Sequence, residues 1–226
     1  MQDKPATYGP LTYWRDLLRL FTGEGVIHEN LDIPLDEAVV RSRYASFWSS
    51  ALIVYAIAMY LLTGHNKPQW TTSLPLAVEL LTFVVGIVVV IVGAGFAVYG
   101  LLRLYTLVGH NLTTNLFKVR GQRLRLLSAE TTLLSLVAPF VGGLMVRTMF
   151  PVLGWAIMTA TVLYAVILAG RVYNTIFHTT GISGLWVFLA GTLVTWFVLA
   201  IGALAVAVAA GVIGFLLLLI LRGFHH

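Results

Sequence analysis

Long, uninterrupted runs of apolar residues dominate the chain from residue 44 onward. They cover residues 44–62, 76–105, 128–148, 151–171 and 185–221, and short polar connections separate them. Each run can supply a helix of about 20 residues, the length that crosses the hydrocarbon core of a bilayer. A membrane β-barrel would instead show short segments of alternating polarity. The pattern therefore predicts an all-α fold, a polytopic bundle of transmembrane helices.

The last apolar run, residues 185–221, decides the number of spans. As a single helix it would be about 55 Å long, yet no charged residue interrupts it before Arg222. We expect an interfacial or re-entrant start at residues 185–191 followed by one long span, which gives about five spans. Two short spans that hinge near Gly202 are the alternative, which gives six.

The only sizeable polar segment comes first, at residues 1–43, and we expect it to form an N-terminal region ahead of a membrane domain at residues 44–222. Within it, the apolar residues of positions 11–21 recur at helical spacing, which predicts a short amphipathic helix. A second short helix is expected at residues 33–43. The first helix could lie in the membrane interface or pack on the ends of the bundle.

Composition agrees with a membrane protein, because 59% of the 226 residues are hydrophobic and only 10% are charged. Soluble domains carry about 25% charged residues. The net charge is +5, and the stretch 103–125 holds five basic residues and no acidic one. Since basic loops face the cytoplasm, we expect this loop and the N-terminus to be cytoplasmic. A multi-pass protein of the cell membrane, in a bacterial inner membrane, fits the absence of cysteine and of a cleavable signal.

Small residues at helical spacing predict close helix packing in two of the spans. We expect a packing interface at Gly86, Gly93, Ala97, Gly100, Ala203, Ala207, Gly211 and Gly214. Van der Waals contact between such faces drives association in membranes. The interface could join a partner subunit or another copy, or it could lie within this chain's own bundle. In the third span, Pro139 removes a backbone hydrogen bond and is expected to kink the helix.

Few residues suggest chemistry. The chain has no cysteine, and no zinc motif, phosphate-binding loop or nucleophile elbow is present, so we expect no catalytic or metal site and no enzyme activity. We also expect no nucleic-acid binding, because no basic patch lies on a soluble domain. Glu130 is expected near a helix start, where the helix dipole would stabilise it. His110 and His178 follow the second and fourth spans and are possible ligands for haem or a pigment, although we expect no cofactor.

From Ser128 onward the sequence resembles the Yip1 family of small polytopic membrane proteins. The similarity covers about a quarter of the chain: Pro139 in one span, Tyr164 in the next, and then the polar connection HTTGIS that ends at Ser183. The resemblance implies five spans, a cytoplasmic N-terminal region, and a role in membrane organisation, trafficking or complex assembly.

The sequence therefore favours a non-enzymatic scaffold or accessory subunit of a larger membrane assembly, with the lipid bilayer and a membrane protein as partners. Two alternatives remain open. One is a carrier or channel for a small or lipophilic molecule, with a cavity near Pro139. The other is a haem-, quinone- or pigment-binding subunit that uses His110 or His178.

Overall fold

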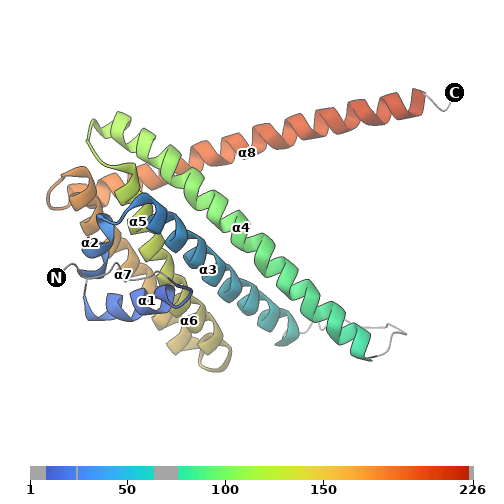
Figure 1. Ribbon diagram of the computed structural model, residues 1–226, viewed down its shortest axis with the longest axis horizontal. Helices are drawn as coiled ribbons and strands as arrows, with labels where there is room; N and C mark the ends of the chain where they lie inside the picture. The colour runs from blue at the N-terminus through green and yellow to red at the C-terminus, as the bar shows by residue number, and fades with distance from the viewer. Residues whose placement is uncertain (1–8, 24, 64–75, 224–226) are drawn as a thin grey trace.

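The computed structural model describes residues 9–23, 25–63 and 76–223, and these residues form helices joined by short connections. The helices are α1 (Thr12–Thr22), α2 (Gly25–Leu31), α3 (Leu35–Thr63), α4 (Leu76–Phe117), α5 (Arg123–Leu133), the 3-10 helix η1 (Leu134–Leu136), α6 (Val137–Met149), α7 (Pro151–Phe177) and α8 (Ser183–Gly223). The all-α bundle is confirmed, and Figure 1 shows the long helices crossing one another.

Four helical stretches among the described residues are long and apolar enough to cross a membrane: Val84–Phe117, Arg123–Met149, Pro151–Phe177 and Ser183–Val212. The predicted first span, residues 44–62, lies within α3. The polar connection between the predicted first and second spans falls mostly in residues 64–75, outside the described residues. These helices make the protein a multi-pass membrane protein. α3, which contains the predicted first span, is not one of the four stretches.

Several predicted boundaries are wrong because helices continue through polar residues. The second span was expected to end at residue 105, but α4 runs on to Phe117, so the loop that follows is confined to residues 118–122. The short helix expected at residues 33–43 is the beginning of α3, which continues into the predicted first span. Polar side chains can stay within a helix by bonding to it: Thr114, for example, donates to the His110 carbonyl of its own helix, and Thr113 is buried against Gly191 of α8.

The last apolar run is one continuous helix. α8 extends from Ser183 to Gly223 with neither a re-entrant start nor a hinge at Gly202. A 41-residue helix is about 60 Å long, twice the roughly 30 Å hydrocarbon thickness of a bilayer. Figure 1 shows its second half, in red, projecting away from the other helices. Its sequence contains no proline, and Thr195 bonds to the Gly191 carbonyl of the same helix without ending it.

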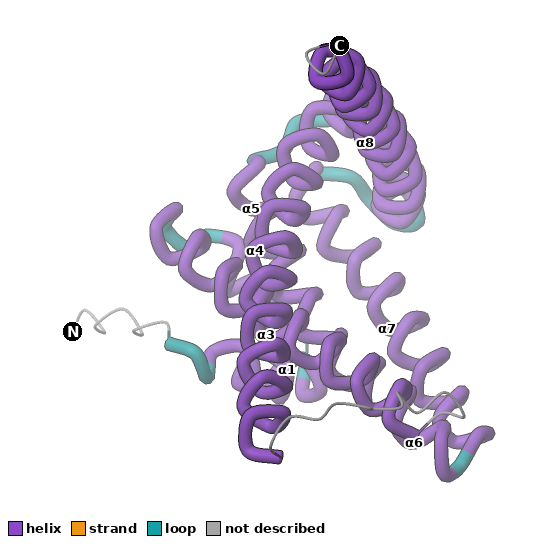
Figure 2. Tube along the Cα trace, turned by 90° about the vertical axis from the view of Figure 1, so that its right-hand side faces the viewer, coloured by secondary structure: helices purple, strands orange, loops and turns teal. Residues whose placement is uncertain are grey.

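Buried residues gather at one end of the bundle. The main apolar cluster takes its members from α1, α2, α5, η1, the end of α7 and the start of α8: Leu17, Leu20, Val26, Ile27, Leu31, Leu126, Ala129, Leu136, Leu168, Val172, Tyr173, Ile176, Phe177 and Val187. We call this end the base. Away from it, α4 at residues 84–94 and α8 at residues 196–208 leave most side chains exposed to the surroundings. Figure 2 shows α8 extending away from the other helices toward the C-terminus.

Candidate functional site

A break in the third span creates a docking point for α1. The helix changes to 3-10 geometry at Leu134–Leu136 before α6 begins. Pro139 lacks the N–H group that would donate to the carbonyl of Ser135 four residues earlier. The Tyr13 hydroxyl of α1 donates to that carbonyl at 3.4 Å and to the Leu134 carbonyl at 3.3 Å. The break therefore lies one turn before Pro139, at the carbonyl to which Pro139 cannot donate.

Two further hydrogen bonds close this junction from α3. Ser49 donates its hydroxyl to the Leu134 carbonyl at 3.3 Å, and the Trp48 indole donates to the Pro10 carbonyl at 2.7 Å. The rings of Tyr13, Trp14 and Trp48 pack together, with the two tryptophan centroids 5.4 Å apart. Because buried carbonyls need donors, Tyr13 and Ser49 compensate for the interrupted helix.

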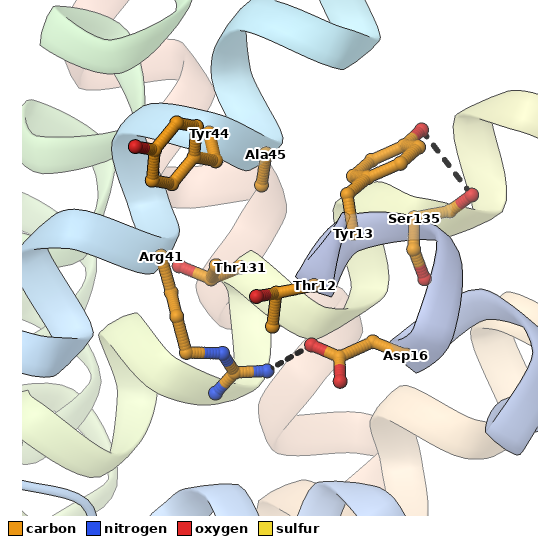
Figure 3. A pocket seen from close by; sticks show the side chains of 8 residues that line it. All are labelled: Thr12, Tyr13, Asp16, Arg41, Tyr44, Ala45, Thr131 and Ser135. Atoms are coloured by element: carbon orange, nitrogen blue, oxygen red, sulfur yellow. Dashed lines mark hydrogen bonds and ion pairs between the residues drawn. The ribbon is translucent and has the colours of Figure 1, made fainter. Parts of the chain in front are cut away.

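A buried ion pair holds the next turn of α1. Asp16 of α1 bonds to Arg41 of α3, and both side chains are almost completely buried. Thr132 of α5 accepts hydrogen bonds from Arg41 at 3.2 Å and from Asn30 of α2 at 3.3 Å, and it donates to the Ser128 carbonyl. Figure 3 shows Asp16 and Arg41 meeting between α1, α3 and α5. Four helices are therefore joined through one polar cluster.

A small cavity lies against this cluster. Its volume is about 10 Å³, and it is lined by Thr12, Tyr13, Asp16, Arg41, Tyr44, Ala45, Thr131 and Ser135. Such a volume holds at most about one water molecule. This cavity is too small for a transported molecule, and the carrier or channel alternative stays a prediction.

A second polar chain crosses the base of the bundle. Tyr173 of α7 donates its hydroxyl to the Glu130 carboxyl of α5 at 3.0 Å. Tyr105 of α4 shares a 2.8 Å hydrogen bond with Thr192 of α8. The two tyrosine hydroxyls lie close enough to interact with each other. The chain thus links α5, α7, α4 and α8 through side chains alone.

The expectation for Glu130 is wrong in its position. Glu130 lies in the second half of α5, which begins at Arg123, so the helix N-terminus does not stabilise it. Its carboxyl is partly buried and bonds to Tyr173. The ion pairs found among the described residues do not include it. A carboxyl in such surroundings depends on its hydrogen bond, because an unpaired buried charge is costly.

Outside the spans, Tyr13, Arg19 and Glu29 of the N-terminal helices have shifted pKa values. Burial raises the pKa of Tyr13 to about 12. The hydrogen bond from Arg19, at 2.6 Å, lowers the pKa of the exposed Glu29 and raises that of Arg19. The Tyr13 hydroxyl therefore remains a donor at physiological pH, as its bonds to the backbone carbonyls require.

The two histidines have local roles in the base. His110 lies inside α4 rather than in a polar connection after a span, and its Nε2 atom bonds to the Gly121 carbonyl at 3.0 Å. His178 ends α7 in the left-handed conformation, with φ 53°. Within the described ranges, three or more metal-ligating side chains do not gather anywhere. Haem, quinone or pigment binding stays a prediction.

The predicted small-residue faces point away from the rest of the bundle. Gly86, Gly93, Ala97 and Gly100 of α4 are exposed, as are Ala203, Ala207 and Gly211 of α8. Among the described atoms, none lies within 4 Å of the place where a Cβ would stand at Gly86, Gly93, Gly100 or Gly211. The surroundings of Gly214 lie outside the described residues.

Other glycines make the close contacts within the chain. A Cβ at Gly95 would lie 2.5 Å from the Phe47 ring, one at Gly109 would lie 3.2 Å from the Thr195 hydroxyl, and one at Gly191 would lie 2.7 Å from the Thr113 hydroxyl. Gly143 similarly abuts Met158. Packing within the chain thus uses glycines that the spacing of small residues did not select.

Sequence reasoning missed the polar clusters, because their members lie far apart along the chain. Tyr173 and Glu130 are 43 residues apart, and Tyr105 and Thr192 are 87 apart. Asp16 was hidden among the seven acidic residues of the first 44 positions. A usable signal was its place on the apolar face of α1, beside Leu17 and Leu20.

Comparison with protein-family models, curated proteins and solved structures found no match to this chain.

Proposed function

We propose that the protein is a non-enzymatic integral membrane protein of the cell membrane, a scaffold or accessory subunit of a larger membrane assembly. Its resemblance to the Yip1 family favours the same role. The observation that carries the proposal is the open small-residue face of α4, where Gly86, Gly93 and Gly100 meet nothing within the described chain. A face of this kind suits a second transmembrane helix, because backbones can approach closely there.

The position of the face supports this reading. Successive residues of an α-helix are rotated by about 100°, so Gly86, Gly93 and Gly100 lie on one side of α4. Gly95, which is buried against Phe47 of α3, lies on the opposite side. α4 therefore uses one glycine side within the chain and leaves the other available to a partner chain.

α8 offers a similar division. Its contacts to the bundle use Gly184, Val187, Gly191 and Thr195, all buried. Ala203, Ala207 and Gly211 lie farther along, on a different side of the helix and exposed. The partner we propose is another membrane protein or a second copy of this chain, with α4 and α8 as its contact surfaces. The N-terminus and the base would face the cytoplasm, in a bacterial inner membrane.

Photo-crosslinking in native membranes tests the proposal. A photoreactive amino acid placed at Gly93 or Ala207 is expected to give a discrete adduct with a protein. The control is Val85, which is exposed on α4 away from the glycine side. Adducts with lipid alone at positions 93 and 207, as at position 85, would contradict the assembly role.

A further inference from the structure

Each of the four candidate spans has one end at the base of the bundle. The residues at which they end or begin there are Phe117, Arg123, Phe177 and Ser183. Two short connections, at residues 118–122 and 178–182, join these ends, and both lie at the left of Figure 1. A Cβ at Gly121 would lie only 2.6 Å from the Phe177 ring, so the first connection touches the end of α7. The two connections therefore mark one level, where four spans leave the hydrocarbon.

The connection between α4 and α5, at residues 118–122, is held against the bundle by alternate residues. Val119 packs against the main apolar cluster. Two positions later, the Gly121 carbonyl bonds to the Nε2 atom of His110 at 3.0 Å, and the Gly121 backbone lies against α7. This connection therefore has a defined position at the end of the spans, and its remaining side chains face away from the core.

Three basic side chains are exposed on this connection and at the start of α5: Lys118, Arg120 and Arg123. Within the described part of the chain, none of the three takes part in an ion pair or a side-chain hydrogen bond. Asp32, in the connection before α3, is paired with Arg125 at 2.7 Å. A stretch of six residues is at most about 20 Å long, so three uncompensated positive charges lie close together.

Large apolar side chains are exposed beside these charges. Leu116 is 55% exposed and Phe117 is 37% exposed on the last turn of α4. Near the start of α8, Ile182 is 69% exposed and Trp186 is 62% exposed. Tryptophan concentrates at the boundary between hydrocarbon and head groups. Apolar groups at the end of the spans and cations just beyond it match the order of acyl chain and phosphate in a phospholipid.

We propose that this surface binds anionic phospholipids, with Lys118, Arg120 and Arg123 at the phosphates and Leu116 and Phe117 against the acyl chains. Basic segments directly beside a span are attracted to anionic lipids. Each cation at such a surface raises the affinity about fivefold, and the three act together because the connection holds them in place. The surface lies at the opposite end of α4 from Gly86 and Gly93, so a protein partner on the glycine side does not compete with the lipid.

A fluorophore in the connection tests the proposal with the whole protein reconstituted in vesicles. The chain has no cysteine, and Gln122 is exposed between Arg120 and Arg123, so Gln122→Cys places a single label there. The vesicles contain phosphatidylcholine and phosphatidylglycerol at low ionic strength, and only one of the two carries a nitroxide on its acyl chain near the head group. At equal mole fraction, nitroxide-labelled phosphatidylglycerol should quench the fluorophore more than nitroxide-labelled phosphatidylcholine does. Equal quenching by the two lipids would overturn the proposal.

A matched pair of variants in the labelled protein tests the role of the cations. Arg120→Gln should lower the preference for phosphatidylglycerol about fivefold. Arg147→Gln should leave it unchanged, because Arg147 is exposed near the other end of the span Arg123–Met149. Both arginines are exposed, so folding does not depend on their charge. An unchanged preference in Arg120→Gln, or the same loss in Arg147→Gln, would contradict the site.

Inorganic phosphate distinguishes a lipid head group from a soluble phosphate. Phosphate and sodium chloride at equal ionic strength should weaken the preference for phosphatidylglycerol to the same extent, because both only screen the charges. A preference that phosphate removes and chloride leaves in place would assign the three cations to a soluble anion and would contradict the proposal.

Discussion

At the scale of single residues, the junction between α1 and the bundle depends on charged and polar groups that are buried together. Asp16 and Arg41 form an ion pair across α1 and α3, and Thr132 bonds to Arg41 as well. A buried ion pair adds little net stability compared with apolar residues of similar shape, but the loss of one partner leaves an uncompensated charge. The pair therefore determines the position in which α1 attaches, and it adds little to the free energy of that attachment.

This distinction predicts an asymmetry between single and double variants. Arg41→Met or Asp16→Leu alone should lower the free energy of unfolding by about 3–5 kcal/mol. The double variant should recover most of that loss, because no charge is left buried. Chemical unfolding of the purified protein in detergent measures all three. Single variants that match the parent chain would contradict the ion pair, since both side chains are almost completely buried.

Tyr13 predicts a pH dependence of the same junction. Its pKa is raised from the usual 10 to about 12, so the folded state favours the neutral hydroxyl. The stabilisation from that preference is complete below pH 10 and is lost as the pH rises through about 12. Proteolysis of the α1 segment between pH 9 and pH 12 should therefore accelerate in the parent chain. Tyr13→Phe should lack this component, and identical alkaline profiles would contradict it.

At the scale of elements, the break at Leu134–Leu136 explains where α1 binds. Pro139 supplies no N–H to the carbonyl of Ser135, and Tyr13 bonds to that carbonyl from outside the helix. The proline thus exposes an acceptor within a predicted span, and a separate helix supplies a donor. If residue 139 had an N–H, a side chain bonding to the Ser135 carbonyl would compete with a hydrogen bond of the helix itself.

Pro139→Ala should restore the backbone donor and weaken the attachment of α1. Amide hydrogen exchange in α1 is expected to become severalfold faster, because the Ser135 carbonyl would then bond within its own helix. Pro151→Ala is the matched control, since Pro151 begins α7, where an N–H has no helical partner. Unchanged exchange in α1 for Pro139→Ala would show that the break does not hold it.

Two neighbouring glycines of α4 should respond differently to the same change. Gly95→Val would force a side chain into the Phe47 ring, and overpacking of this kind costs about 1–3 kcal/mol. Gly93→Val meets nothing in the described chain, so the stability of the isolated protein should stay as it is. Thermal unfolding in detergent compares the two. Equal losses would mean that both glycines pack within the chain.

At the scale of the whole molecule, the hydrophobic runs predicted the helical class and the position of every long helix. They failed at the ends, where α4 continues through Thr113 and Thr114 and α8 continues without a turn. Hydropathy reports which residues can enter lipid, but packing decides where a helix stops. Thr113, for example, is buried against Gly191 of α8, so its polar side chain gives no reason to end α4.

The polar clusters could not be predicted, because they join residues from different helices. The sequence placed Glu130 near a helix start, whereas its environment depends on Tyr173 of α7. The packing interface expected at the small residues stays a prediction. The small-residue spacing selected Gly86, Gly93 and Gly100. It did not distinguish them from Gly95, Gly109 and Gly191, which pack inside the chain, because the choice of face depends on the arrangement of the helices.

The arrangement of the molecule combines a buried base with long helices that leave it largely uncovered. α4 and α8 cross near the base and then separate (Figure 1), so each has one side that the chain itself does not cover. Lipid alone can cover an apolar side, but Gly86, Gly93 and Gly100 gain no special contact from lipid. This arrangement is the basis of the proposed role in a larger assembly.

The most direct measurement of that role is the mass of the particle extracted together with its native lipids. Native mass spectrometry of the parent chain is expected to give a defined complex heavier than one chain, and a Gly86→Leu, Gly93→Leu variant is expected to give the single chain, still folded. A single folded chain from the parent protein itself, in its native lipids, would contradict the account.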